Sequence, residues 1–222
     1  MIRLLVGVLV FVINTVYRDR PIPRFYVLET VARVPYFSYL SVLHLYETLG
    51  WWRKADWLKV HFAESWNELH HLLIMEELGG DKFWGDRFLA RHVALLYYWI
   101  IVLLYLVYPN GAYHFMELVE GHAYNTYNKF LKENEADLKV QPAPKVAVQY
   151  YRDGDLYLFD EFQTGRKLET RRPATDNLYD VFVNIRDDEQ EHVKTMVACQ
   201  QPDARLSFKS PHSPVPIGSG ID

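Results

Sequence analysis

The sequence predicts an all-α protein built around a four-helix bundle. Three stretches of the chain place apolar residues, together with Glu or His, at alternating spacings of three and four, which is the pattern of one helix face. These faces run along residues 57–75, 113–131 and 178–196. A fourth stretch, residues 25–32, is mostly apolar and contains a single Glu. Each stretch therefore predicts one helix with a buried side and a carboxylate on it.

The composition narrows the class of protein. A chain of 222 residues is long enough for one domain with a sizeable core, which we expect over residues 1–205, followed by a frayed tail over 206–222. The net charge of -4 offers no electrostatic surface for nucleic acid, so no such partner is expected. The single Cys199 excludes an intrachain disulfide and thiolate metal clusters. The 16 Tyr and 6 Trp are typical of proteins that contact a membrane interface.

The first helices are bounded by proline and glycine. One is expected to begin near Arg24, to be interrupted at Pro35, and to continue to Leu49 before Gly50. The next is expected from Asp56 to the Gly79–Gly80 pair, because glycine commonly ends a helix.

The second half of the chain alternates helices with one irregular segment. Helices are expected over 93–108 and 112–132, and a last one over 175–200. Between them, the prolines and glycines within residues 133–172 predict an irregular insertion with at most short turns of helix, and a connection of that length is often functional or mobile.

Two apolar runs indicate a contact with the membrane. Residues 93–108 contain no charged side chain, yet they are shorter than the roughly 20 residues that a spanning helix needs. Residues 4–13 form a still shorter run. Both fit amphipathic helices that lie in one leaflet, which would make the protein monotopic. A buried core helix and a true span are the alternatives for residues 93–108.

Two Glu-x-x-His motifs, Glu68–His71 and Glu189–His192, lie within the predicted helices. Residues three apart share one helix face, so each motif directs a carboxylate and an imidazole to one point. Glu29 and Glu120 each lie alone among apolar neighbours on two further helices. One Glu from each of two helices and a Glu-x-x-His motif from each of the other two form the ligand set of ferritin-like di-iron and di-manganese bundles.

Buried carboxylates need partners, because an unpaired charge in a protein core costs several kcal/mol. Four of them can persist together only by sharing protons or by binding cations. Carboxylates combined with imidazole suit iron or manganese. From the residues alone, two alternatives remain open. Glu68 and His71 could form a surface pair near Glu76, and Glu189 could belong to a solvated, charged helix face.

These residues together resemble the alternative oxidase family. The resemblance is carried by Leu28–Thr30 with Arg33–Phe37, by Asn67–His71, by Glu120 with Tyr127, and by Arg186–His192. The sequences EELGGDKFW after the second ligand helix and DLYLFDEFQT in the insertion are typical of the plastid branch, the plastoquinol oxidases. The resemblance extends over about residues 10–200.

The resemblance implies a centre of two iron ions and a reaction in which two quinols reduce O₂ to water without proton pumping by the fold itself. Asn67 and Asp188, each next to a ligand Glu, are expected to orient ligands through hydrogen bonds. The implied iron ligands are Glu29, Glu68, His71, Glu120, Glu189 and His192.

Tyr127 lies seven residues after Glu120, about two turns along the same helix face. The resemblance implies that it is a redox or proton donor beside the irons, whereas the alternative is an ordinary core tyrosine. For the quinol head group, the resemblance points to Arg24, Leu28 and Thr126, although Arg24 could instead anchor the chain to lipid head groups. Many relatives carry Glu at the position two residues after the third ligand, Glu120. This chain has His122 there, so the resemblance implies no quinol-binding role for it.

The resemblance also implies partners and a location: plastoquinol and O₂, a thylakoid membrane contacted from one leaflet, and a homodimer or higher homo-oligomer. Two other functions fit the ligand set. One is a different di-iron enzyme, such as a quinone-ring hydroxylase, which would insert oxygen into its substrate. The other is a non-catalytic, ferritin-like iron-binding protein. Such a protein would assemble into a soluble shell, against which the apolar run at 93–108 argues.

Overall fold

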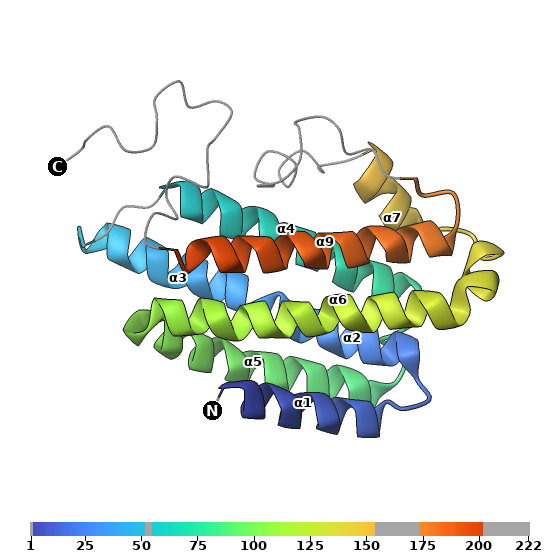
Figure 1. The fold of residues 1–222 in the computed structure, drawn as a ribbon, viewed down its shortest axis with the longest axis horizontal. Coiled ribbons are helices and arrows are strands. Elements are labelled where there is room, and N and C mark those ends of the chain that lie inside the picture. Colours follow the sequence, from blue (N-terminus) through green and yellow to red (C-terminus); the bar gives the residue numbers. More distant parts are fainter. Residues whose placement is uncertain (1, 52–54, 154–173, 202–222) are drawn as a thin grey trace.

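The described residues form helices joined by short connections, and no strand occurs among them. The computed structural model describes residues 2–51, 55–153 and 174–201. The helices lie side by side along the long axis of the molecule (Figure 1). The expected tail at 206–222 and residues 154–172 of the expected insertion lie outside the described residues.

Four helices form the bundle that the sequence predicts. They are α2 (Pro21–Ala32), α4 (Ala55–Glu77), α6 (Pro109–Lys139) and α9 (Leu178–Cys199). Helix α6 packs along α9, and α2 packs on α4. The predicted all-α fold with a four-helix bundle is confirmed. Around it, α3 (Val34–Thr48) packs on α4 and α5 (Trp84–Val107), while α1 (Ile2–Val16) contacts α6.

The turns at two helix ends follow from single residues. The break near Pro35 falls at Arg33, and Pro35 lies in the first turn of α3, where a missing backbone N–H is tolerated. At the end of α4, Gly79 has a φ of 83°, a conformation that favours glycine. The next amide, that of Gly80, then donates to the carbonyl of Met75 at 2.8 Å and closes the helix.

Two helices are longer than the sequence pattern predicts. Helix α5 begins at Trp84, nine residues before the apolar run, because charged side chains such as Arg87 are compatible with exposed helical turns. Helix α6 continues to Lys139 instead of ending near residue 132. Its last turns are polar, and they are supported by a pair four residues apart in which Lys139 donates to Glu135 at 2.5 Å.

The prediction of an irregular insertion over 133–172 is wrong for residues 133–139, which continue α6. After α6 ends, the expected short turns of helix are α7 (Lys145–Val148) and a short π-helix, η1 (Gln149–Asp153). Glu77 at the end of α4 accepts the backbone amides of Lys145 and Val146 at 2.9 and 2.8 Å. A carboxylate at a helix amino terminus accepts hydrogen bonds from amides that have no acceptor within the helix. Glu77 is far from this helix in the sequence, so the prolines of the segment do not predict the contact.

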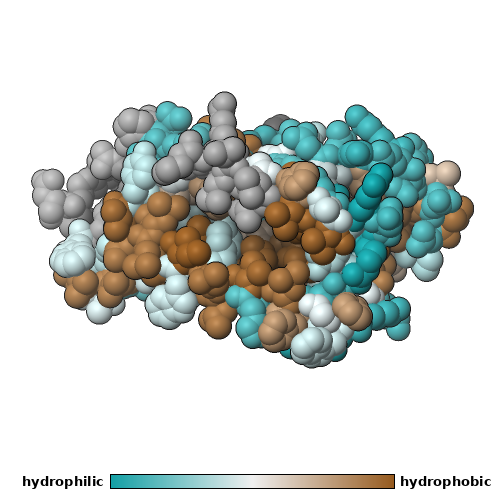
Figure 2. Space-filling model, turned by 90° about the horizontal axis from the view of Figure 1, so that it is seen from below, coloured by the Kyte–Doolittle hydropathy of each residue, from teal (hydrophilic) through white to brown (hydrophobic). Residues whose placement is uncertain are grey.

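Apolar side chains gather on the face formed by α1 and α5. Exposed residues on this face include Phe11, Leu96, Trp99 and Leu103, of which Leu96 is 65% exposed. Figure 2 shows the hydrophobic surface on the side where α1 and α5 lie in Figure 1. Among the described helices, α5 is long and apolar enough to cross a membrane, and only 17% of its most apolar window is buried. The interpretation of residues 93–108 as a buried core helix is therefore not supported.

Candidate metal centre

Six side chains from the four bundle helices meet in the interior. Helices α2 and α6 each contribute one Glu, and α4 and α9 each contribute a Glu-x-x-His motif. All six are buried, including Glu189, which is 1% exposed, so the alternative of a solvated charged face is wrong. The residues are Glu29, Glu68, His71, Glu120, Glu189 and His192.

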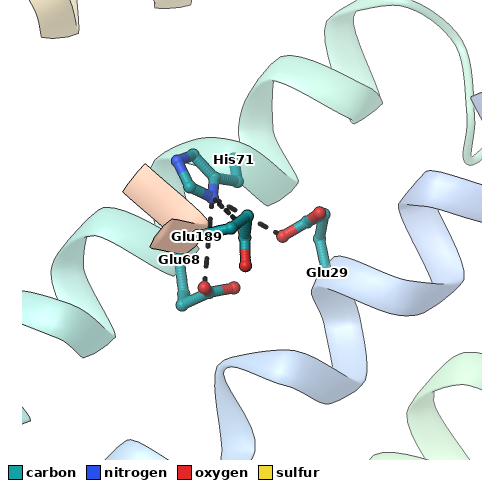
Figure 3. A group of neighbouring side chains, drawn as sticks. All are labelled: Glu29, Glu68, His71 and Glu189. Carbon is teal, nitrogen blue, oxygen red and sulfur yellow. Dashed lines mark ion pairs between the residues drawn. The ribbon is translucent and has the colours of Figure 1, made fainter. Parts of the chain in front are cut away.

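The first half of the cluster surrounds His71, whose Nδ1 atom points at three carboxylates (Figure 3). It lies 3.2 Å from Glu189 Oε1, 3.7 Å from Glu29 Oε2 and 4.0 Å from Glu68 Oε1. These four residues offer ligand atoms that all lie within 4.8 Å of one another. Three carboxylates and one imidazole at such spacing can hold a metal ion.

The second half surrounds His192. Its Nδ1 atom lies 2.9 Å from Glu68 Oε1 and 3.9 Å from both Glu120 Oε1 and Glu189 Oε2. These four residues form a second group with ligand atoms within 4.8 Å of one another. Glu68 and Glu189 belong to both groups, so they lie where carboxylates would bridge two neighbouring ions.

Several of the potential ligand atoms have no hydrogen-bond partner among the described residues, which favours a metal ion as their partner. Glu29 Oε2, Glu68 Oε2 and His71 Nδ1 are buried and have no hydrogen-bond partner. Buried polar atoms of this kind are rare, because each leaves its desolvation uncompensated. Hard oxygen donors mixed with imidazole nitrogen suit iron or manganese. The residues present are therefore compatible with the two irons that the sequence predicts.

In the metal-free cluster, burial and the closeness of the carboxyl groups to one another determine the direction of their pKa shifts. Burial and the neighbouring carboxylates raise the pKa of Glu68 and of Glu189 well above the usual range. Burial also raises the pKa of Glu120 to about 7. These groups hold protons tightly until a cation replaces them.

A second layer of hydrogen bonds surrounds the ligand positions. Asp188 Oδ2 lies 3.0 Å from His71 Nε2 and accepts hydrogen bonds from Asn67 and Tyr151, both at 2.8 Å. A carboxylate accepts protons, so we assign the His71 proton to Nε2, which leaves the lone pair of Nδ1 directed at the cluster. Asp188 thus contacts His71, and Asn67 contacts Asp188, rather than the glutamates next to them.

Two tyrosines contact the glutamates directly. The hydroxyl of Tyr127 donates to Glu29 Oε1, and that of Tyr36 donates to Glu120 Oε1. Burial, followed by the charge of Glu29, raises the pKa of Tyr127 well above its usual value, so the phenol keeps its proton. Tyr127 therefore holds a proton at a carboxylate of the cluster.

A groove of about 820 Å³ opens between α1, α2 and α6. Its lining includes Arg24, Phe25, His122 and Thr126. Phe25 also stacks on Tyr127 with ring centroids 4.3 Å apart, so one aromatic ring connects the groove to the tyrosine that contacts Glu29. Two of the three residues predicted for the quinol, Arg24 and Thr126, line this groove.

Leu28, the third of those residues, is not among the groove's lining and packs against the core instead.

Comparison with known proteins identifies the family. Residues 2–201 match the family model described as alternative oxidase. The chain belongs to the alternative oxidase family. It is 66% identical over 202 residues to ubiquinol oxidase 4, chloroplastic/chromoplastic, of Arabidopsis thaliana, a match that covers 91% of this chain and 57% of that protein. It is 30% identical over 166 residues to mitochondrial ubiquinol oxidase 2 of Glycine max, covering 74% and 44% of the two chains.

The higher identity to the chloroplast relative confirms the resemblance to the plastid branch of the alternative oxidase family. The chain spans about half the length of the curated relatives it matches. Because the family model matches residues 2–201, the match covers the bundle and all six residues of the cluster.

Sequence reasoning missed three tyrosines around the centre of this member of the alternative oxidase family. Tyr36 lies within the motif Arg33–Phe37, yet it was not assigned to the site because its partner Glu120 is 84 residues away. Tyr150, which accepts a hydrogen bond from Asn67, and Tyr151 lie in the segment predicted to be irregular. Only the register of the π-helix brings both rings to the centre.

The metal-free protein is expected to be most stable in mild acid. A carboxyl group whose pKa is higher in the folded than in the unfolded chain adds stability below its unfolded pKa, and that stability is lost as the pH rises through the folded pKa. For Glu120 this stability is lost as the pH rises from 4.5 to about 7. Thermal unfolding of the metal-free chain should give a higher Tm at about pH 5 than at about pH 8. A Tm that rises toward alkaline pH would contradict this expectation.

Proposed function

We propose that this chain is a membrane-bound plastoquinol:oxygen oxidoreductase that reduces O₂ to water with electrons from two quinols. The observation that carries the proposal is the buried cluster of four glutamates and two histidines in a chain of the alternative oxidase family. The names of its relatives describe them as ubiquinol oxidases, which supports a quinol as the reductant.

In this proposal the six residues hold two iron ions. Glu68 and Glu189, which belong to both groups, would be shared between the ions, and the Glu29–His71 and Glu120–His192 pairs would each help to hold one of them. Bound iron would supply the redox chemistry that O₂ reduction requires. The protein contributes a dry interior, and Asp188 and Asn67 fix the orientation of the His71 ring.

The groove beside Tyr127 is the proposed site of the quinol head group. Arg24 Nε is buried without a hydrogen-bond partner, so the guanidinium can donate to a head-group oxygen. Thr126 offers a hydroxyl in the same groove, whereas Leu28 packs against the core. Tyr127 stacks on Phe25 of the groove wall and donates to Glu29, so its phenol can supply a proton to the cluster.

Arg24→Ala is expected to raise the KM for a short-chain plastoquinol about tenfold, since a hydrogen bond from a charged group contributes roughly 1.5–3 kcal/mol. Steady-state O₂ uptake at varied quinol concentration measures this change. Arg18→Ala is the matched control, because Arg18 lines the same groove but is exposed. Equal KM values for the two variants would remove Arg24 from the quinol site.

We further propose that α1 and α5 rest in one leaflet of the thylakoid membrane, so that the protein is monotopic. The exposed apolar residues of both helices support this orientation. The plastid relative supports a plastid location, and the resemblance implies a homodimer or higher homo-oligomer. Entry from the lipid phase would bring plastoquinol to the groove next to α1.

The double variant Leu96→Glu/Leu103→Glu is expected to lower binding to thylakoid-lipid vesicles by more than about tenfold. Each substitution removes an apolar side chain whose burial in lipid contributes roughly 1.5–3 kcal/mol. Vesicle flotation measures the bound fraction. Lys132→Gln/Lys139→Gln changes the net charge equally on a distant part of α6 and should leave binding intact. An equal loss in both variants would attribute the effect to charge alone.

Oxygen uptake tests the function itself. The purified, iron-loaded chain in liposomes should consume O₂ with a short-chain plastoquinol, and ¹⁸O₂ should appear in water. Label in the quinone ring would indicate a hydroxylase instead. Absence of uptake by a protein that holds two irons per chain would refute the oxidase and favour an iron-binding protein.

A further inference from the structure

A second polar network lies in the core, outside the six-residue cluster. Tyr105 on α5, Tyr113 on α6, and His61 with Glu64 on α4 form one continuous chain of contacts. The Tyr105 and Tyr113 hydroxyls are 2.6 Å apart, Tyr113 Oη is 2.9 Å from His61 Nε2, and His61 Nδ1 is 2.8 Å from Glu64 Oε2. All four side chains are buried. The proposed oxidase reaction gives none of them a role.

The protonation of this network makes Tyr113 a proton donor. Burial lowers the pKa of His61 to about 3, so the ring is neutral and carries one N–H. Burial raises the pKa of Glu64 well above its usual value, so its carboxyl group keeps its own proton, and its Oε2 atom accepts the hydrogen bond from His61 Nδ1. The unprotonated Nε2 atom then accepts the hydroxyl of Tyr113. The acceptor for a proton that leaves Tyr113 is therefore His61 Nε2.

Edge-on aromatic rings connect Tyr113 to the cluster. Tyr36 donates to Glu120 Oε1 at 2.5 Å, and its ring centroid is 6.3 Å from that of Tyr39. The Tyr39 ring is in turn 5.1 Å from that of Tyr113. Electron transfer falls steeply with distance, so rings in contact form an efficient route. Tyr39 donates to the carbonyl of Ala112, which cannot take up a proton, so Tyr39 transmits an electron without retaining the oxidised state.

We propose that Tyr113 is a redox-active tyrosine that donates one electron, through Tyr39 and Tyr36, to an oxygen-derived oxidant formed in the cluster when no quinol is bound. The O–H bond of Tyr113 breaks, and its proton moves to His61 Nε2. The products are a neutral tyrosyl radical, a protonated His61 and an oxidant reduced by one electron. A quinol that binds later returns one electron to Tyr113 while His61 returns the proton, and the remaining electron of the semiquinone reduces the oxidant further. The proposal rests on the proposed oxidase function for the source of the oxidant.

The hydrogen bonds distinguish Tyr113 from the other tyrosines near the cluster. Tyr36 and Tyr127 contact glutamates that would hold metal, so a proton that leaves either hydroxyl would enter the cluster itself. Tyr113 instead contacts an imidazole outside the cluster. With its own proton assigned to His61, its oxygen is left to accept the hydroxyl of Tyr105, 2.6 Å away. A hydrogen bond accepted by the phenolic oxygen stabilises the radical, which makes Tyr113 the site where the oxidised state comes to rest.

The test is freeze-quench electron paramagnetic resonance of the full chain. The ferrous-iron-loaded protein is mixed with O₂ in the absence of quinol, and a tyrosyl radical signal is expected. Tyr113→Phe should abolish the signal, and His61→Gln should abolish it by removing the proton acceptor. Tyr105→Phe, the matched control, should keep the radical but shift its g tensor, because the hydrogen bond to the radical oxygen is lost. Circular dichroism and iron content verify that each variant is folded and loaded.

A signal that survives Tyr113→Phe, or no signal from a protein that consumes O₂ with quinol, would overturn the proposal and leave the oxidase function standing. If O₂ uptake itself is absent, hydrogen peroxide replaces O₂ as the source of the oxidant. A Tyr113-dependent radical under those conditions would uphold the redox role of Tyr113 although the proposed function has failed. A radical that is absent or independent of Tyr113 under those conditions would overturn it.

Discussion

Glu68→Gln is expected to deplete both metal ions, because Glu68 belongs to both groups of potential ligands. The amide preserves the volume of the side chain but removes its charge and one oxygen donor. The loss of affinity should exceed the roughly 10- to 100-fold that follows from losing a residue that only orients a ligand. Metal analysis after anaerobic iron loading measures it, and O₂ uptake should fall with the metal content.

Two further variants make this expectation specific. Glu64→Gln changes a buried carboxyl one turn earlier on the same helix, outside both groups, and should keep a full metal content. Glu120→Ala removes a potential ligand from one group only. It leaves that group one ligand short, so activity should be lost as well. A Glu68→Gln protein that retains two irons per chain would disprove the shared-ligand arrangement.

Tyr127→Phe is expected to retain both irons while turnover falls by about 100-fold or more, the range typical of a lost proton-transfer group. The substitution removes the hydroxyl that donates to Glu29 and leaves the ring that stacks on Phe25. Steady-state O₂ uptake and metal analysis, performed on the same preparation, separate these two effects.

Tyr124→Phe is the control for this prediction, because Tyr124 lies on the same helix and is only half-buried. Its turnover should match that of the unmodified protein. Normal turnover in Tyr127→Phe would reduce Tyr127 to a packing residue and would leave the proton route to Glu29 without a donor.

The helices and their inward faces could be predicted because their signals are local. Glu68 and His71 are three residues apart, and that spacing alone places them on one face of α4. The lengths of α5 and α6 were underestimated, since their first or last turns are exposed and charged and carry no apolar pattern. Tyr36 and Tyr151 could not be predicted as neighbours of the centre, because each bonds to a residue on a different element.

By itself, the sequence determined which side chains each helix directs inward, and with them the four glutamates and two histidines of the centre. Only the tertiary structure decided that Glu68 and Glu189 are shared between two groups, and that His71 is oriented by Asp188. It also decided that Tyr113 contacts His61. The physical reason is that helical periodicity depends on neighbours along the chain, whereas the register between helices depends on packing among residues far apart in the sequence.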